Sequence, residues 1–192
     1  MNIDSAFTHF PTLTTSRLTL RQVRLSDADA LFAIKSDPRV TSEYAQEPHQ
    51  SLDDTRGWIQ RLIKSYDQRD GLFWCLTLKG ESNVIGGCPY WNFGPGFHSA
   101  EIGYELHPAY YRQGLMSEAI TAILTYGFNE LGLHRVEANP LARNTASKNL
   151  LLKLGFKYEG NLRQRIFFRG VYEDQLYYGL LKEEWLNKNI YP

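Results

Sequence analysis

The segment from Ala100 to Gly132 constrains the fold of this chain more than any other. Residues 100–106 alternate as a strand does, residues 108–117 are polar and include Gly114, and an amphipathic helix follows directly. A strand that passes through a glycine-containing loop into a helix leaves several backbone N–H groups free at the positive end of the helix dipole. Gly114 lets the backbone approach a ligand closely, so the loop is a candidate site for a pyrophosphate.

The rest of the pattern predicts an α/β (α+β) fold, with a mixed, mostly antiparallel sheet and helices on both faces. We expect residues 1–14 to form an extended N-terminal arm and residues 15–192 a single domain. Capping boxes at Ser26/Asp29 and Ser51/Asp54 predict the starts of two helices. The first should end at residues 37–38 and the second near residue 68. Further helices are expected from Gly114 to Leu131 and over 144–154, with strands at 17–24, 72–78, 83–93, 100–106, 134–138, 156–168 and 171–181 and a hairpin turn at Arg169-Gly170.

Composition and charge exclude several classes of protein. The 21 basic and 21 acidic side chains cancel, whereas a nucleic-acid binder usually has a basic surplus. No apolar run approaches the roughly 20 residues that span a bilayer, and the first residues lack the pattern of a signal peptide. Cys75 and Cys88 lie in apolar, strand-like segments without metal-ligand spacing, and the five histidines form no close pair. We therefore expect a cytoplasmic protein with two buried free thiols and no metal, membrane or direct nucleic-acid contact.

The order of short motifs resembles a known family. After the glycine loop and its helix come a short strand, Asn-Thr-Ala-Ser at 144–147 and a helix ending in Lys-Leu-Gly-Phe at 153–156. This order is similar to that of the GNAT N-acetyltransferase superfamily, over about Arg17 to Trp185. Further pieces resemble its ribosomal-protein N-terminal acetyltransferase (RimJ/RimL) branch, and they lie at residues 15–21, 36–38, 100–104, 144–147 and 155–160.

The resemblance implies acetyl-CoA as cosubstrate, inserted where the strand ending near Leu106 splays from the strand beginning at His134. The family's loop reads Arg/Gln-x-x-Gly-x-Gly/Ala, whereas this chain has Tyr111, Gly114 and Met116 at those three positions. The implied contacts are the main-chain groups of Leu106 and His107 along the pantetheine and the side chain of Asn144, which could equally be a plain helix cap. The backbone N–H groups implied at the pyrophosphate are those of Arg112, Gln113, Gly114, Leu115, Met116 and Ser117.

The reaction needs one group to take a proton from the amine and another to assist the leaving thiolate. Strand alternation predicts Glu101 and Glu105 on one face, with Tyr104 on the other. By resemblance, Glu101 is the general base, unless it only orders a water or forms a salt bridge, and Glu105 is the weaker candidate. Ser147 matches the serine that faces the thioester sulfur in this branch, although it could be a capping or exposed serine. The phenols of Tyr104 and Tyr158 are better explained as core.

The acceptor follows less directly from the sequence. Residues 41–54 line the acceptor cleft in relatives and hold Glu43 and Glu47, besides two aspartates that belong to the first turn of a helix. Two carboxylates are few for a polycation, which favours a protein or peptide α-amine. The alternatives are a small amine (a polyamine, an aminoglycoside or an amino acid) or a non-catalytic acyl-CoA-binding module, because fold does not fix function. The chain is expected to be a monomer or a homodimer.

Overall fold

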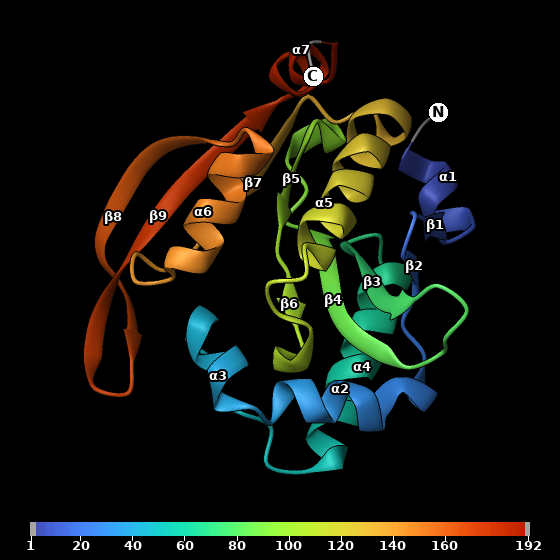
Figure 1. Ribbon diagram of the computed structural model, residues 1–192, viewed down its shortest axis with the longest axis vertical. Helices are drawn as coiled ribbons and strands as arrows, with labels where there is room; N and C mark the ends of the chain where they lie inside the picture. Colours follow the sequence, from blue (N-terminus) through green and yellow to red (C-terminus); the bar gives the residue numbers. More distant parts are fainter. Residues whose placement is uncertain (1–2, 191–192) are drawn as a thin grey trace.

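A computed structural model describes residues 3–190 and has the predicted α/β fold (Figure 1). One sheet runs through the molecule in the order β1-β2-β3-β4-β5-β7-β9-β8, and β6 pairs with β4. Neighbouring strands are antiparallel except β5 and β7, which are parallel. The strands are β1 (Leu13–Thr14), β2 (Leu18–Gln22), β3 (Gly71–Leu78), β4 (Val84–Trp91), β5 (Ser99–Ile102), β6 (Glu105–Leu106), β7 (Arg135–Ala138), β8 (Lys157–Phe168) and β9 (Val171–Leu181).

Helices cover both faces of this sheet. The helices α5 (Leu115–Tyr126) and α6 (Thr145–Leu154) pack on one face, and α2 (Ala28–Lys35) and α4 (Leu52–Asp67) pack on the other (Figure 1). Within residues 3–190, no helix is both long and apolar enough to cross a membrane. The remaining elements are α1 (Ile3–Thr8), η1 (Leu25–Asp27), α3 (Pro38–Thr41), η2 (Ser42–Tyr44), η3 (Pro95–Phe97), η4 (Pro108–Tyr110), the π-helical turn η5 (Gly127–Leu131) and α7 (Lys182–Ile190).

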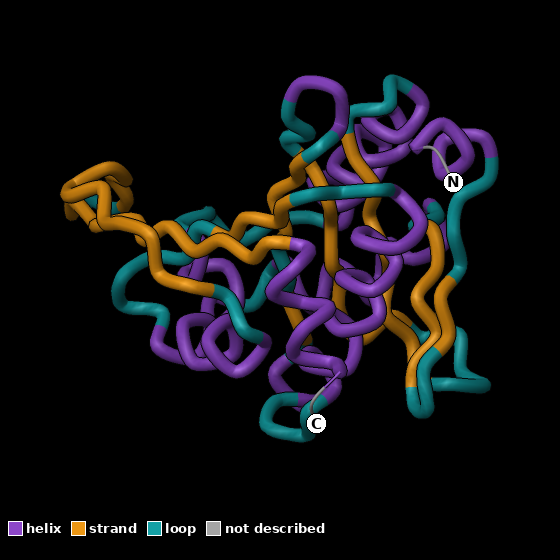
Figure 2. The backbone as a smooth tube through the Cα atoms, turned by 90° about the horizontal axis from the view of Figure 1, so that it is seen from above, coloured by secondary structure: helices purple, strands orange, loops and turns teal. Residues whose placement is uncertain are grey.

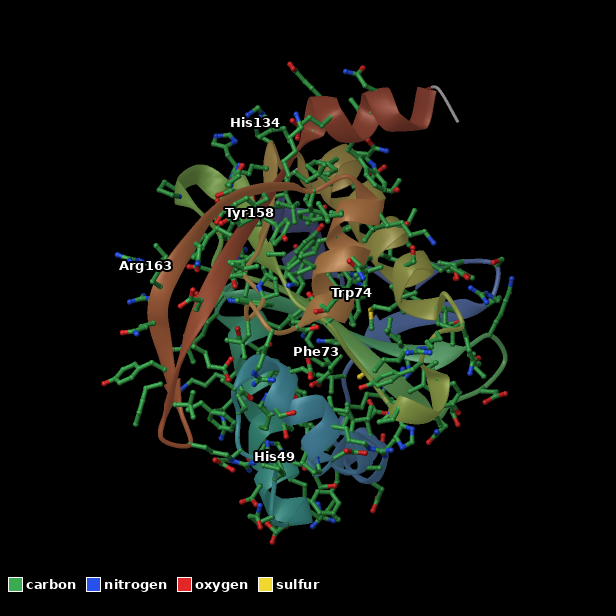
Figure 3. The ribbon with its side chains drawn as sticks, turned by 60° about the vertical axis from the view of Figure 1, so that its left-hand side comes forward. His49, Phe73, Trp74, His134, Tyr158 and Arg163 are labelled. Atoms are coloured by element: carbon green, nitrogen blue, oxygen red, sulfur yellow. The ribbon has the colours of Figure 1, made fainter. Side chains whose placement is uncertain are left out.

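Two neighbouring residues of β3 show how the sheet divides the core. Trp74 packs with the helices α5 and α6, whereas Phe73 belongs to the cluster under α2 and α4. The Trp74 ring meets Tyr90 edge-on at 5.8 Å, and Phe73 meets Trp58 at 5.2 Å. Figure 3 labels both residues inside the molecule. Because successive side chains of a strand point to opposite faces, one apolar strand supplies both cores.

Both ends of the chain differ from expectation. The predicted extended arm is wrong, because residues 3–8 form α1 and bury Ile3 and Ala6 against the core. The rings of Phe7 and Phe10 also dock on Tyr66, at 5.6 and 5.5 Å. At the other end, α7 was not predicted, and it buries Trp185. Apolar contacts with distant elements therefore order both segments.

The first predicted capping box is also wrong. The residue that begins this helical region is Arg24, whose backbone N–H donates to the Asp27 carboxylate at 2.8 Å. Arg21 donates to both oxygens of that carboxylate, at 2.8 and 2.7 Å. Asp27 therefore takes the role assigned to Ser26 and Asp29. The second box is confirmed, since Ser51 and Asp54 each cap the other's backbone N–H.

Strands β8 and β9 form a long hairpin that projects beyond the rest of the fold (Figure 2). Arg169 and Gly170 have φ angles of +49° and +80°, which confirms the predicted turn. Register passes from Leu162↔Gln175 to Ile166↔Glu173, so residues 163–165 bulge out opposite Asp174. Strand β8 is mostly exposed, whereas β9 is mostly buried or half-buried, and Figure 3 labels Tyr158 and Arg163 on β8.

Candidate active site

The strand predicted over residues 100–106 is interrupted, and this interruption opens the site. The strands β5 and β6 keep one register with β4, with Glu101 opposite Trp91 and Glu105 opposite Gly87. Opposite Pro89 the ladder is incomplete, because the N–H of Gly103 donates to the Pro89 carbonyl at 3.2 Å but Pro89 has no N–H to donate in return. Only β5 continues across the sheet, pairing with β7 through Glu101↔Glu137. Beyond that pair, β6 and the chain after β7 separate, as expected from the sequence.

One residue of β6, Leu106, directs its main-chain N–H and C=O toward this separation. In the antiparallel ladder with β4, the N–H of His107 donates to Ile85 at 2.8 Å. Because hydrogen-bonded and non-bonded pairs alternate, the N–H and C=O of Leu106 face away from β4. His107 differs, since its C=O also accepts a hydrogen bond from the N–H of Tyr110, at 2.9 Å. Of the two residues expected along a pantetheine arm, Leu106 therefore has main-chain groups that face away from β4, whereas both main-chain groups of His107 bond to residues 3–190.

The loop before α5 has the geometry of an anion site. Arg112 and Gly114 both have left-handed backbones, with φ of +59° and +76°, and Gly114 is the N-cap of α5. Within the described chain, the backbone N–H groups of residues 112–117 have no hydrogen-bond acceptor. A left-handed turn at the start of a helix gathers such N–H groups into a concave nest that suits phosphate. The bulk of Met116 leaves these N–H groups in place, because any residue other than proline supplies one.

A carboxylate in the first turn of α5 fixes this loop to β2. Glu118 accepts hydrogen bonds from the hydroxyls of Thr15 and Ser16, at 2.6 and 2.9 Å, and from Arg17, whose Nε lies 2.6 Å away. Burial opposes its ionisation, but these hydrogen bonds outweigh burial and lower the pKa of Glu118 to about 2. Arg17 also donates to the carbonyl of Gln113, at 2.9 Å. A pocket of about 490 Å³ lies beside this anchor, bordered by Gly114, Ser117 and Lys153 among others.

Glu101 lies on the face of β5 away from α5 and α6. It is half-buried, next to Glu137 of β7, and the amide of Asn92 donates to it at 3.5 Å. Burial raises the pKa of Glu101 above its ordinary value, and the charge of Glu137 adds to that rise. Hydrogen bonds from the side chains of Asn92 and Asn139 act in the opposite direction. Glu101 is thus a carboxylate whose affinity for a proton is increased, which suits a general base.

Glu105 is held differently on the same face. Its carboxylate is buried, lies 2.7 Å from the ammonium of Lys35 and accepts the Tyr44 hydroxyl at 2.7 Å. The ammonium also lies 4.3 Å from the centre of the Trp58 ring. Lys35 and Tyr44 thus both direct their donors at one oxygen of this carboxylate. Glu105 therefore suits a structural ion pair between β6 and α2 better than a proton acceptor.

Ser147 lies beside the separation between β6 and β7, on the face of the sheet opposite to Glu101. It is buried in the first turn of α6, and its hydroxyl is 2.6 Å from that of Tyr104. Burial raises the pKa of Tyr104, so its hydroxyl keeps its proton and can donate to Ser147. Asn144 caps α6 by accepting from the N–H of Ser147 at 2.9 Å, and its amide donates to the Glu43 carbonyl at 3.2 Å. Tyr158 is exposed, so its assignment to the core is wrong.

The carboxylates of residues 42–47 are matched by arginines. Arg169 at the hairpin tip donates to both oxygens of Glu47, at 3.0 and 2.6 Å. Arg143 lies 3.8 Å from Glu43, bonds to Glu173 of the hairpin and donates to the Ser42 carbonyl. These contacts tie the segment to the hairpin and to the start of α6. They also place an arginine beside each of its two glutamates, although Arg143 is shared with Glu173.

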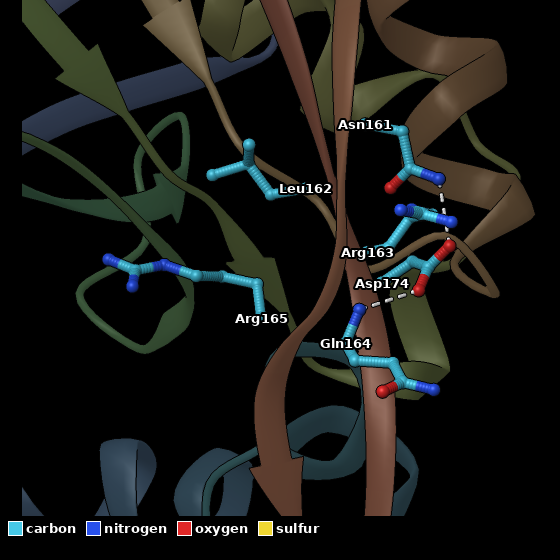
Figure 4. Close-up of a pocket in the computed structure, with 6 residues that line it drawn as sticks. All are labelled: Asn161, Leu162, Arg163, Gln164, Arg165 and Asp174. Carbon is cyan, nitrogen blue, oxygen red and sulfur yellow. Dashed lines mark hydrogen bonds between the residues drawn. The ribbon is translucent and has the colours of Figure 1, made fainter.

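A second pocket, of about 660 Å³, lies at the bulge of β8 (Figure 4). Asp174 there accepts hydrogen bonds from the side chain of Asn161 and the backbone of Gln164, at 2.7 and 2.8 Å. Arg165 points to the opposite side of the hairpin from these groups. The Asp174 carboxylate of β9 is thus occupied by the neighbouring strand β8, and this pocket offers no proton-transfer group comparable with Glu101.

A family model matches most of the chain, including the separated strands and the loop before α5. Residues 17–157 match the acetyltransferase (GNAT) domain. The chain belongs to the GNAT family of acetyltransferases. This GNAT protein is 38% identical over 173 residues to an uncharacterized N-acetyltransferase, YoaA, of Bacillus subtilis, and the match covers 90% of this chain and 98% of YoaA.

One further relative and one solved structure are also similar to this chain. This acetyltransferase is 30% identical over 182 residues to the [ribosomal protein uS5]-alanine N-acetyltransferase of Escherichia coli, covering 90% of this chain and 92% of that one. It shares its fold with RimL, a ribosomal L7/L12 alpha-N-protein acetyltransferase solved in complex with coenzyme A. That match has a TM-score of 0.81 and 21% identity, and covers 89% of this chain and 98% of RimL. The predicted family and fold are confirmed, and the protein is an N-acetyltransferase.

Sequence reasoning missed several residues of this acetyltransferase's site. Tyr104 packs against the core as predicted, but the contact of its hydroxyl with Ser147 was not foreseen. Glu118 and Asn139 were not singled out, and their partners lie far away in the sequence. The one available signal was the Thr15-Ser-Arg17 motif, whose three residues all bind Glu118.

Proposed function

We propose that this enzyme transfers the acetyl group of acetyl-CoA to the α-amine of a protein or peptide N-terminus. The observation that supports it most is the placement of Glu101 and Ser147 on opposite faces of the sheet, beside the separation between β6 and β7. A thioester lying in that separation would have a proton acceptor on the side where an amine can enter. A hydroxyl donor would lie on the side where the thiolate leaves.

The loop and β6 would hold the donor. The N–H groups of residues 112–117 bind the pyrophosphate, and the main-chain groups of Leu106 that face away from β4 bind the pantetheine. Asn144 acts by capping α6, which fixes Ser147. Much of the rate would come from positioning, because holding an amine against a thioester replaces a bimolecular encounter.

The reaction needs a proton acceptor near the amine and a hydrogen-bond or proton donor near the departing thiolate. The amine nitrogen attacks the thioester carbonyl, the C–S bond breaks, and Glu101 takes the proton that the nitrogen loses, directly or through water. The departing thiolate accepts a hydrogen bond or a proton from Ser147, whose hydroxyl is in turn supported by Tyr104. Glu105 stays in its ion pair with Lys35.

The choice of acceptor rests on charge and on basicity. An α-amine has a pKa of about 7.7–8.0 and a lysine side chain about 10.4, so a carboxylate base removes the proton of an α-amine more readily near neutral pH. The two carboxylates that could have attracted a polyamine, Glu43 and Glu47, lie beside Arg143 and Arg169. The uS5-alanine relative supports the same class of acceptor.

A competition assay tests this choice. The acceptors are a peptide with a free α-amine, the same peptide blocked at its N-terminus and carrying lysine, and spermidine. We expect the free α-amine peptide to have the highest kcat/KM, measured by thiol release. A higher value for spermidine or for the lysine peptide would replace the proposal with a small-amine or lysine acetyltransferase.

Removing the hydroxyl of Ser147 should slow turnover without weakening binding of acetyl-CoA. Ser147→Ala is expected to lower kcat by about tenfold or more, because the thiolate loses its donor. Tyr104→Phe should lower kcat as well, since it removes the partner of that hydroxyl. Tyr90→Phe is the matched control, because it also removes a buried phenolic hydroxyl, one that donates to the Ile123 carbonyl at 3.2 Å in the core. If Ser147→Ala and Tyr90→Phe have the same kcat, Ser147 has no part in the chemistry.

A further inference from the structure

A side-chain oxygen beside Glu101 has no partner. Asn139 directly follows β7, at the point where β7 has lost its pairing with β5. Its Oδ1 is buried and makes no hydrogen bond to any described residue, whereas its amide acts on Glu101 and lowers the pKa of that carboxylate. Buried carbonyl oxygens are almost always hydrogen-bonded in folded proteins, so an orphan in a site calls for a ligand or a water.

The position of Asn139 explains why its oxygen is left over. Its own carbonyl accepts from Gln175 of β9 at 3.3 Å, and Pro140 bonds through its carbonyl to the N–H of Leu176, so the backbone here is tied to β9. Strand alternation puts Asn139 on the face of Glu137 and Glu101, because Val136 and Ala138 belong to the opposite core. The amide must turn its nitrogen toward the Glu101 carboxylate, since the reverse orientation would set two acceptors against each other.

The surroundings favour a cation-like donor. Glu101 and Glu137 lie side by side, and because Arg135 pairs with Glu137 at 2.7 Å, Glu101 is the carboxylate that a ligand N–H reaching Asn139 would meet. Trp91 of β4 closes the site on the other side, since its ring lies over Gly103, where a Cβ would come within 2.6 Å of it. An amine with two or more N–H groups satisfies this arrangement, by giving one hydrogen bond to Oδ1 and one to Glu101.

We propose that Asn139 binds the acceptor amine, with Oδ1 accepting one N–H of the reacting nitrogen while Glu101 takes its proton. This inference rests on the proposed function and adds a specificity-determining residue to it. An oxygen that accepts an N–H fixes the direction of the nitrogen lone pair once the proton has left. It also disfavours acceptors without such an N–H, such as tertiary amines and alcohols.

Three variants separate the oxygen of Asn139 from its nitrogen. Asn139→Ala removes both, and Asn139→Asp keeps an oxygen in place of Oδ1. Asn92→Gly is the matched control, because Asn92 also donates to Glu101, at 3.5 Å, and glycine suits its φ of +51°. We expect Asn139→Ala to raise the KM for the amine about tenfold or more, the loss typical of a hydrogen bond to a charged group. The KM for acetyl-CoA should stay unchanged, and neither Asn92→Gly nor Asn139→Asp should raise the amine KM comparably.

The measurements use whichever amine the wild type acetylates fastest. Affinity of the enzyme–CoA complex for that amine is also measured by calorimetry, without turnover. A wild type that prefers spermidine overturns the α-amine proposal, while the prediction for Asn139→Ala stands and is tested with spermidine. Equal amine KM and equal affinity in Asn139→Ala and Asn92→Gly would mean that Oδ1 only holds a water, and would overturn this inference. If the wild type acetylates none of the three amines, equal affinity of the wild type and Asn139→Ala for the free α-amine peptide also overturns it.

Discussion

Glu101→Gln should lower kcat by about 10²-fold or more, since a single general base contributes typically 10²–10⁴-fold. Glutamine keeps the size of the side chain and the hydrogen bond with Asn92, but it cannot accept the proton of the amine. The affinity for acetyl-CoA should change little, because Glu101 lies on the face away from the phosphate loop and α5. The measurement is kcat at saturating acetyl-CoA, together with the dissociation constant of acetyl-CoA.

Glu137→Gln is the matched control for that experiment. Glu137 is the neighbour of Glu101 on β7, and its charge contributes to the raised pKa of Glu101. A base works only when deprotonated, so kcat falls as the pH falls through its pKa, and a raised pKa puts that fall at a higher pH than for an ordinary glutamate. Glu137→Gln should retain a kcat near that of the wild type and shift the acid limb to lower pH. A Glu101→Gln enzyme with wild-type kcat would move the proton role to Glu105 or Tyr158.

Gly114→Val should abolish most of the thermal stabilisation by acetyl-CoA. A ligand at about 100 times its Kd stabilises the folded state by about 2.7 kcal/mol, which raises Tm by several degrees. Valine is strongly disfavoured at a φ of +76°, so the turn that presents the N–H groups would distort. The strain itself costs roughly 1–3 kcal/mol, which should leave the protein without ligand folded.

Gly132→Val supplies the comparison. Gly132 has almost the same φ, +77°, and it lies at the far end of η5, where no described atom comes within 4 Å of the place that a Cβ would take. The variant Gly132→Val should lose a similar amount of stability and keep the full rise in Tm that acetyl-CoA causes. If acetyl-CoA raises the Tm of Gly114→Val as much as that of the wild type, the loop at residues 112–117 is not the phosphate site.

Local patterns in the sequence were sufficient for most of the fold. The apolar repeat of α5, the capping box at Ser51 and the turn at Arg169-Gly170 are local signals, and all three lie where they were expected. The helix α1 had a signal that was overlooked, because Ile3, Ala6, Phe7 and Phe10 recur at helical spacing. Its length of six residues is too short for a stable isolated helix, so packing on the core decides it.

The site was less accessible to sequence reasoning, for a physical reason. Motifs were enough to nominate Glu101 and Ser147, but the surroundings of both residues depend on where β6 and β7 separate. Tyr104 and Ser147 are 43 positions apart, and their contact follows from the packing of α6 on the sheet. The roles of Asn139 and of the pair Lys35–Glu105 likewise depend on strand register and on helix placement, neither of which a local pattern encodes.

The position of the acetyl group on a peptide product shows directly which kind of amine the enzyme acetylates. A peptide that carries both a free α-amine and a lysine is incubated with the enzyme and acetyl-CoA near neutral pH, and fragmentation in a mass spectrometer locates the acetyl group. We expect the acetyl group on the N-terminal nitrogen, and we expect Glu101→Gln to slow its appearance strongly. Acetyl on the lysine side chain in the wild-type reaction would contradict the account.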